Sequence, residues 1–227
     1  CTESSAGVNT KVWSREGRVY RITPRRNDAV NDSWMSDSGR MLYKKCEGSG
    51  RLVEPQVGGH HMGSEETLSR IAVLLKNEKA AIVASAFSSV EEQFLLKRLA
   101  GAIHAGVHMI SHTQKGDGLL ISEDATPNLR GALLTGLISR IPSDNLRALG
   151  DKIDAGEVET LVCVREDLVQ AGLSQAQLDK VNLVYLGTHT PSFAQSANVL
   201  MGVPTVFERA GSFVNCQWRI QKFAQAV

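Results

Sequence analysis

Short apolar runs separated by helix-type segments constrain the fold of this chain more than any other feature. The runs at residues 80–86, 160–164 and 182–186 contain no charged residue. Such runs are typical of strands that are buried on both faces of a parallel sheet. Two further strands are predicted at 107–111 and 203–207. Because helical patterns alternate with these strands, we expect right-handed βαβ units and helices on both faces of the sheet.

The predicted helices begin at recognisable capping residues. Ser64 is expected to cap a helix over 65–76, and Ser89 forms a capping-box pattern with Glu92 that opens a helix ending near His104. The remaining helices are predicted at residues 128–138, 143–155, a short segment from 174, and 191–200.

The N-terminal part of the chain has a different pattern. Residues 10–13 and 19–23 alternate apolar and polar side chains around Glu16 and Gly17, which predicts a β-hairpin. A short helix is predicted at 38–45, and the glycine-rich stretch 58–63 predicts a linker. We therefore expect an α/β chain of two parts. They are a small β-rich module, residues 1–57, and a mostly parallel α/β sheet domain, residues 58–227.

Four positions in the N-terminal module have the spacing of an iron–sulfur site but contain one cysteine. Cys1, Ser4, Val8 and Ser36 would read C-x2-C-x3-C-x27-C if all four were cysteines. Serine offers a harder, less acidic oxygen, and valine offers no ligand. Because a cubane cluster normally takes four protein ligands, these are interpreted as vestigial cluster positions. The segment is expected to have no catalytic, cofactor-binding or metal-binding residue of its own.

Three stretches in order along the chain carry a resemblance to a known family. They are residues 9–40, 118–132 and 207–221, which include NTKVWSREGRVYRITPR, GLLISEDATPNLRGA and FERAGSFVN. They resemble the molybdopterin-oxidoreductase region in the large G subunit of NADH:quinone oxidoreductase, respiratory complex I. Its mitochondrial relatives are similar, and there the same cysteines are often absent. The resemblance implies that module 1–57 is a degenerate 4Fe-4S type and that 58–227 is molybdopterin-oxidoreductase-like.

The resemblance also implies a function and partners. The segment would be a non-catalytic structural domain of the NADH-to-quinone electron-transfer arm, at the cytoplasmic side of the inner membrane. The 4Fe-4S and 2Fe-2S clusters would lie in ferredoxin-like domains of the same subunit that precede this segment. Since the chain begins with Cys rather than Met, we expect it to be a piece of a longer polypeptide.

Contacts with those domains and with other peripheral-arm subunits are expected at residues 15–26, Trp34, Met35 and Arg40. Aromatic, Met and Arg side chains are enriched at interface cores. For Trp13 and Trp34, packing inside the small module is the alternative.

A second hypothesis is a cofactor-binding fragment of a molybdopterin or iron–sulfur oxidoreductase similar to formate dehydrogenase. Those enzymes enclose a bis-pterin cofactor with much longer chains, so the present chain offers little room for it.

A third hypothesis is an α/β domain that binds a small molecule. No G-x-G-x-x-G follows the run at 80–86, although helix N-termini at Ser89 and Pro191 are possible anion sites beside ordinary capping.

Other reactive side chains have structural interpretations. His104, His108 and His112 have the spacing of one helix face, but Gly106 interrupts that helix, so scattered imidazoles are preferred over a metal site. His60 and His61 are assigned to a solvated loop. Cys163 is expected to be a small buried side chain, Cys46 to be exposed at a helix end, and Cys216 to pack.

Composition excludes several classes of function. Lys and Arg number 25 against 24 Asp and Glu, which argues against nucleic acid as a partner. No apolar run reaches the ~18 residues of a membrane helix, so no direct membrane insertion is expected. The four cysteines are widely scattered and do not suggest a disulfide framework.

Overall fold

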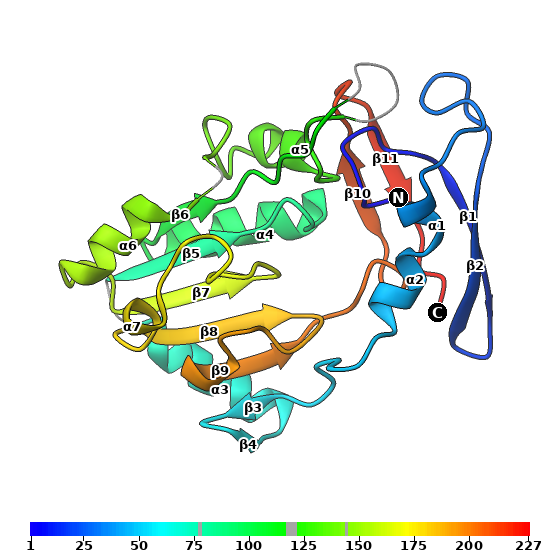
Figure 1. Cartoon of the computed structure of the whole chain (residues 1–227). Helices are drawn as coiled ribbons and strands as arrows, with labels where there is room; N and C mark the ends of the chain where they lie inside the picture. Colours follow the sequence, from blue (N-terminus) through cyan, green and yellow to red (C-terminus); the bar gives the residue numbers. More distant parts are fainter. Residues whose placement is uncertain (77–78, 117–121, 144) are drawn as a thin grey trace.

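A seven-stranded sheet forms the larger part of the molecule, in the order β4-β3-β9-β8-β7-β5-β6 (Figure 1). The computed structural model describes residues 1–76, 79–116, 122–143 and 145–227. Strands β5 to β9 run parallel, and the β3–β4 hairpin adds an antiparallel edge. The strands are β3 (Gln56–Val57), β4 (His60–His61), β5 (Ala80–Ala84), β6 (Gly106–Met109), β7 (Thr160–Val164), β8 (Asn182–Gly187) and β9 (Ala197–Gly202). The α/β class with a mostly parallel sheet is therefore confirmed.

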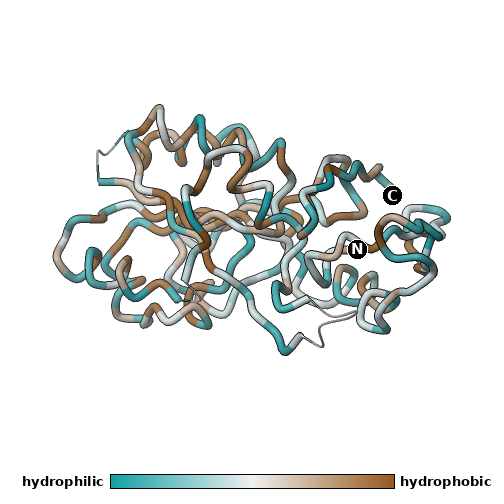
Figure 2. Tube along the Cα trace, turned by 90° about the horizontal axis from the view of Figure 1, so that it is seen from above, coloured by the Kyte–Doolittle hydropathy of each residue, from teal (hydrophilic) through white to brown (hydrophobic). Residues whose placement is uncertain are grey.

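The central strands are apolar throughout because both faces of the sheet are covered. On β7, Leu161 and Cys163 belong to one hydrophobic cluster, and Val162 and Val164 belong to the cluster on the opposite face. All five residues of β7 are buried. Figure 2 shows the hydrophobic strand segments running through the middle of this body. The pleat alternates side chains between faces, so only a continuous apolar run satisfies both.

Five helices cover the two faces of the sheet. Apolar side chains of α3, α4 and α5 join the cluster on one face, and those of α6 and α7 join the cluster on the other. Their bounds are α3 (Ser64–Leu74), α4 (Val90–Ala102), α5 (Leu129–Leu134), α6 (Arg147–Asp154) and α7 (Gln175–Leu178). The predicted capping box of α4 is confirmed, since Ser89 and Glu92 exchange both hydrogen bonds.

The small body beside the sheet contains both chain termini (Figures 1 and 2). Its elements are the hairpin β1 (Thr10–Arg15) and β2 (Arg18–Pro24), helices α1 (Asp37–Arg40) and α2 (Leu42–Cys46), and a second hairpin of β10 (Gly211–Val214) and β11 (Ile220–Phe223). Its hydrophobic cluster combines Val8, Met35 and Leu42 with Phe207 and Val227 from the C-terminal segment. The N-terminal β module is thus present, and the end of the chain packs against it.

Three predicted elements are wrong. Residues 191–200 do not form an α-helix, because only Ala194–Ser196 form a 3-10 turn and β9 then begins at Ala197. Residues 203–207 are not a strand, since Pro204 lacks the N–H that a ladder requires. The stretch 58–63 is not a free linker: Gly58 and Gly59, with φ of 57° and 81°, form the turn between β3 and β4.

Other predicted helices are present but shorter. The helix predicted at 128–138 ends at Leu134, and Gly136 then adopts a φ of 68°. The helix predicted at 143–155 begins at Arg147, and its position 144 lies outside the described residues. Of the family-like stretch 118–132, residues 118–121 also lie outside them. Two leucines of the predicted helices, Leu68 on α3 and Leu95 on α4, are 53% and 58% exposed.

Candidate functional site

Of the four positions with cluster-type spacing, Cys1 and Ser36 lie beside Gly39, and Cys1 also contacts Val8. A β-carbon built on Gly39 would lie 2.8 Å from Cys1 Sγ and 3.1 Å from Ser36 Oγ. The backbone nitrogen of Cys1 donates to the carbonyl of Val8 at 3.0 Å. The spacing in the sequence therefore corresponds to proximity in space for these positions.

The side chains at these positions make ordinary structural contacts. Val8 is 5% exposed and belongs to the hydrophobic cluster of the small body. Ser36 Oγ caps α1 by accepting from Gly39 N at 3.1 Å. Ser4 Oγ accepts from the backbone N–H of Ala6 at 3.4 Å. One thiol, two occupied hydroxyls and a buried isopropyl group do not fit a cubane cluster, which needs four ligands.

A cavity of about 600 Å³ adjoins this region. Its walls come from Cys1, Val8 and Met35 on the N-terminal side and from Phe207 and Phe223 on the C-terminal side. The cavity therefore lies where the first and last segments of the chain face each other. Among the described residues, no group of three or more His, Cys, Asp or Glu side chains is placed to hold a metal ion.

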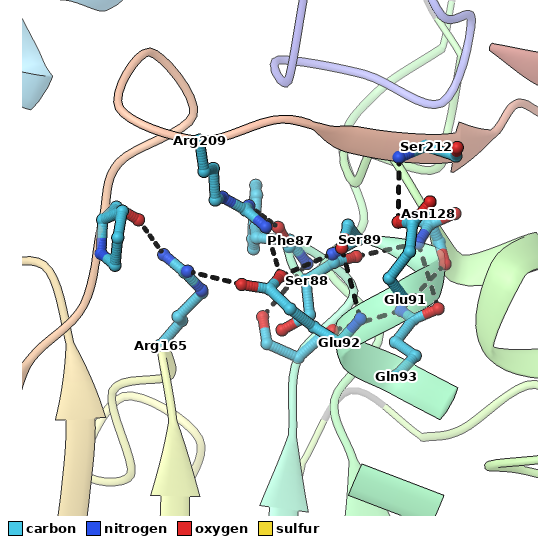
Figure 3. Close-up of polar contacts among 12 residues, drawn as sticks. Phe87, Ser88, Ser89, Glu91, Glu92, Gln93, Asn128, Arg165, Arg209 and Ser212 are labelled. Carbon is cyan, nitrogen blue, oxygen red and sulfur yellow. Dashed lines mark hydrogen bonds and ion pairs between the residues drawn. The ribbon is translucent and has the colours of Figure 1, made fainter. Parts of the chain in front are cut away.

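A second candidate site lies at the carboxyl ends of β5 and β7, which are adjacent in the sheet. The strand order reverses here, because β6 follows β5 on one side and β7 lies on the other. In open α/β sheets, ligands bind at such a crevice, often with a phosphate at the N-terminus of the first helix. In this chain that helix is α4, and the loop before it carries Ser88 and Ser89 (Figure 3).

The carboxylate of Glu92 occupies the anion position of this crevice. It accepts from the backbone N–H of Ser89 at 2.7 Å and from Arg165 Nη2 at 3.1 Å, and it also pairs with Arg209 (Figure 3). The side chains of Arg165 and Arg209 are only 9% and 10% exposed. Burial and the neighbouring Arg165 lower the pKa of Arg209, and Glu92 opposes that shift. A protein carboxylate thus fills the place of a ligand phosphate.

The two arginines connect this crevice to the C-terminal segment. Arg165 Nη1 donates to the carbonyl of Pro204 at 3.0 Å, and Arg209 Nη2 donates to that of Phe87 at 2.9 Å. Arg165 has a φ of 58°, a left-handed conformation that costs a non-glycine residue about 1–3 kcal/mol. The surrounding contacts hold it there.

Strand β10 is attached to the sheet body through buried polar groups. Asn128 Oδ1 accepts from Val214 N at 2.7 Å, while its Nδ2 donates to Ser88 O at 2.8 Å and to Gln93 Oε1 at 3.0 Å. Asn128 and Gln93 are both 0% exposed. Beside them, Glu91 Oε2 accepts from Ser212 N at 3.0 Å. Burial raises the pKa of Glu91, but hydrogen bonds from backbone and serine groups outweigh it, so the net pKa is lowered.

A smaller cluster of polar side chains lies at the same carboxyl edge of the sheet. Glu166, which is 3% exposed, accepts from Ser85 Oγ at 2.6 Å and lies 2.7 Å from His112 Nε2. The hydrogen bond to Glu166 raises the pKa of His112, against the opposing effect of burial. The carboxylate stands between the hydroxyl and the imidazole, so this is no nucleophile–base pair.

The structure places the histidines and cysteines of the sequence analysis on several different elements. His104 follows α4, His108 lies in β6, and His112 lies beyond it, so the three do not share a helix face. His60 and His61 are exposed but form β4 rather than a loop.

Cys163 is buried in β7, as expected, and burial raises the pKa of its thiol. Cys46 is not fully exposed, because it packs on the small cluster, and burial raises its pKa to about 11. Of the predicted anion sites, the Ser89 terminus is filled by Glu92, and no α-helix begins at Pro191.

Several residues of the sheet-edge crevice are not among the site residues predicted from the sequence. Arg165 and Glu166 directly follow the buried run 160–164, and a charged pair at the carboxyl end of a predicted parallel strand was an available signal. Asn128 and Arg209 lie inside the two family-like stretches. Their partners depend on contacts between distant segments, which no local pattern reveals.

Comparison with known proteins finds similarity to one kind of protein over part of the chain. Residues 4–44 match the family described as NADH-ubiquinone oxidoreductase NDSU1/NuoG-like, 4Fe-4S domain. The G subunit of NADH-quinone oxidoreductase from Rickettsia conorii is 35% identical over 100 residues, which cover 41% of this chain and 15% of the relative. The corresponding G subunits from Yersinia pestis and Pseudomonas putida are 33% and 31% identical over 107 and 103 residues, each covering 45% of this chain.

The fold is that of an α/β chain, and its residues 4–44 are similar to a 4Fe-4S domain of the NuoG-like type. The chain is related to the G subunit of NADH-quinone oxidoreductase. The aligned region covers only 15%, 12% and 11% of the lengths of the three relatives, so the chain corresponds to a small part of such a protein. Within the described part of the chain, no helix is both long and apolar enough to cross a membrane.

Proposed function

We propose that this segment is a non-catalytic structural part of a complex I subunit of the G type. It joins the electron-transfer domains of the longer subunit to its neighbours in the peripheral arm, at the cytoplasmic side of the inner membrane. The 4Fe-4S and 2Fe-2S clusters belong to ferredoxin-like domains elsewhere in that subunit. The division into a degenerate cluster module, residues 1–57, and a molybdopterin-oxidoreductase-like domain, residues 58–227, belongs to the same proposal.

The observation that carries the proposal is the structural use of the former ligand positions. Val8 is buried in a hydrophobic cluster, and Ser36 caps a helix. A position that contributes to packing and capping has a reason to persist without iron. The crevice at the sheet edge supports the same conclusion, because Glu92, Arg165 and Arg209 fill it with internal ion pairs.

Two substitutions in the full-length subunit of the source organism test this function. Cys1→Ser removes the one thiol at the vestigial positions, and Asn128→Ala removes the buried link to β10. We expect Cys1→Ser to leave both the amount of assembled complex and its NADH–quinone turnover unchanged. Asn128→Ala should lower the amount of assembled complex without changing turnover per complex.

The opposite pattern contradicts the proposal. If Cys1→Ser lowers turnover per assembled complex while assembly is normal, the vestigial positions take part in electron transfer. A loss of activity without loss of assembly in Asn128→Ala would likewise indicate a catalytic role for the sheet domain.

A further inference from the structure

The hairpin β1–β2 concentrates positive charge on a chain that is otherwise balanced. Residues 10–26 contain 6 Lys and Arg and 1 acidic residue, against 25 and 24 in the whole chain. In Figure 1 the hairpin lies at one end of the molecule, beyond α1 and α2. One face of it packs on the small body through Val19 and Ile22, which are 3% and 4% exposed.

The register of the two strands collects cations and aromatics on the opposite face. Trp13 stands opposite Arg21, and Lys11 is two residues before Trp13, so these three side chains point the same way. Beyond the register shift, Arg15 stands opposite Arg18. Trp13 and Tyr20 are each 56% exposed. We call this exposed set the basic hairpin face: Lys11, Trp13, Arg15, Arg18, Tyr20 and Arg21.

Three of the four cations of this face have no ion-pair partner within the described chain. Arg15 pairs only with its neighbour Glu16, and both side chains are more than 70% exposed, at 80% and 74%. Lys11, Arg18 and Arg21 have no hydrogen-bond or ion-pair partner among the described side chains. Like charges directly opposite each other on two strands are destabilising. The isolated molecule therefore bears an electrostatic cost that an external acidic group would relieve.

We propose that the basic hairpin face docks on an acidic surface of a neighbouring protein subunit. This inference rests on the structural function proposed above. Arg, Trp and Tyr are the residues that most often dominate binding energy at interfaces. The backbone of this face is a paired hairpin packed on the small hydrophobic cluster, so little backbone ordering is needed on binding. Charge complementarity selects a partner surface rich in Asp and Glu and disfavours basic ones.

Charge reversal in the full-length subunit tests this docking. The variant Lys11→Glu/Arg21→Glu is compared with Arg70→Glu/Arg98→Glu, which reverses two exposed cations on α3 and α4. The measurement is the fraction of subunit that co-migrates with the assembled complex on a native gel. We expect the hairpin variant to lose about tenfold or more in co-migration, as opposed charges at an interface do, and the control to match the wild type.

A second measurement does not depend on the stability of the charge-reversed variant. A p-benzoylphenylalanine photo-crosslinker at Tyr20 should capture a peptide rich in Asp and Glu from another subunit. Absence of that cross-link, together with normal co-migration of the hairpin variant, overturns the docking surface and leaves the structural function intact. Failure of the unmodified segment to enter an NADH–quinone complex overturns the proposed function and, with it, this partner.

Two other outcomes also overturn the inference by assigning the face to another occupant. One is a dimer of the isolated chain that light scattering shows to dissociate in Lys11→Glu/Arg21→Glu. The other is salt-sensitive binding of a single-stranded oligonucleotide that the same variant abolishes and the control retains.

Discussion

Arg165 Nη2 lies 3.1 Å from Glu92 Oε1, and this ion pair joins the loop after β7 to the first turn of α4. The pair lies at the point where open α/β sheets hold their ligands. Here the carboxylate comes from the helix itself, and a second guanidinium, from Arg209, approaches from the segment before β10. The crevice is therefore closed by contacts that also attach the C-terminal segment to the sheet.

Replacing Glu92 by alanine removes the carboxylate that pairs with the guanidinium groups of Arg165 and Arg209. We expect Glu92→Ala to lower the free energy of unfolding by about 2–4 kcal/mol, since the pair is largely but not completely buried. Phosphate or sulfate should then stabilise the variant more than the wild type in a thermal unfolding assay, because an anion replaces the carboxylate. Glu157→Ala, at an exposed glutamate, is the control. Equal phosphate stabilisation of wild type and Glu92→Ala would contradict the assignment of Glu92 as an internal anion.

Removal of the Asn128 side chain leaves three buried polar groups without a partner. These are Val214 N, Ser88 O and Gln93 Oε1. We expect Asn128→Ala to destabilise the fold by roughly 2–4 kcal/mol and to speed exchange of the Val214 amide. Asn182→Ala, at an exposed asparagine of β8, should change stability by about 0.5 kcal/mol or less. Similar losses in the two variants would show that the buried network contributes little.

The His112–Glu166 pair predicts a pH dependence of stability with a definite sign. The folded state raises the pKa of His112 above 6.5, chiefly through its hydrogen bond to Glu166. The contribution of the pair is therefore complete below the unfolded pKa and is lost as pH rises through the raised folded value. The difference in unfolding free energy between wild type and His112→Asn should be larger near about pH 5.5 than near about pH 8.5.

Urea titrations of both proteins measure this difference, and subtracting the variant removes the contribution of other titrating groups. Among these, His108 has a pKa lowered by burial and by Lys152. A difference that grows with rising pH would refute the assigned protonation.

Two glycines on different elements give opposite predictions for the same substitution. A β-carbon on Gly202 would collide with the backbone carbonyl of Leu52, whereas one on Gly101 meets nothing within 4 Å. We expect Gly202→Ala to cost about 3 kcal/mol or more and Gly101→Ala, inside α4, to stabilise by about 0.5–1 kcal/mol. Thermal midpoints of the two variants check both signs. A Gly202→Ala protein as stable as the wild type would mean that the Leu52 carbonyl does not lie against Gly202 of β9.

The sequence predicted those elements whose burial is uniform. Strand Thr160–Val164 was located without error because both of its faces are covered, which demands an uninterrupted apolar run. The capping box at Ser89 was predictable because its hydrogen bonds span three residues. The sequence of β9 predicts a helix, because the extended conformation of this segment depends on neighbouring strands. It pairs with β3 on one side, and on the other side Asn198 Oδ1 accepts from Leu183 N of β8 at 2.6 Å.

The residues of the candidate sites likewise differ in whether the sequence alone predicts them. The interpretation of Cys1, Ser4, Val8 and Ser36 as vestigial cluster positions rests on ligand spacing, which can be read directly from the sequence. Met35, expected at a contact surface, is instead 5% exposed, in the hydrophobic cluster that also contains Phe207 and the last residues of the chain. The pairing of Glu92 with Arg165 and Arg209 also depends on segments far apart in the chain, so residue patterns alone did not predict it.

We propose that the N-terminal module is retained for its packing and lacks the ligands to hold an iron–sulfur cluster. The most direct test is anaerobic reconstitution of the chain with iron and sulfide, followed by iron analysis and a visible spectrum. A Ser4→Cys/Val8→Cys/Ser36→Cys variant tests whether restored thiols can hold a cluster. We predict no stable absorption band near ~400 nm and far fewer than about four iron atoms per wild-type chain. A stable band of that kind with about four irons per wild-type chain would contradict the account.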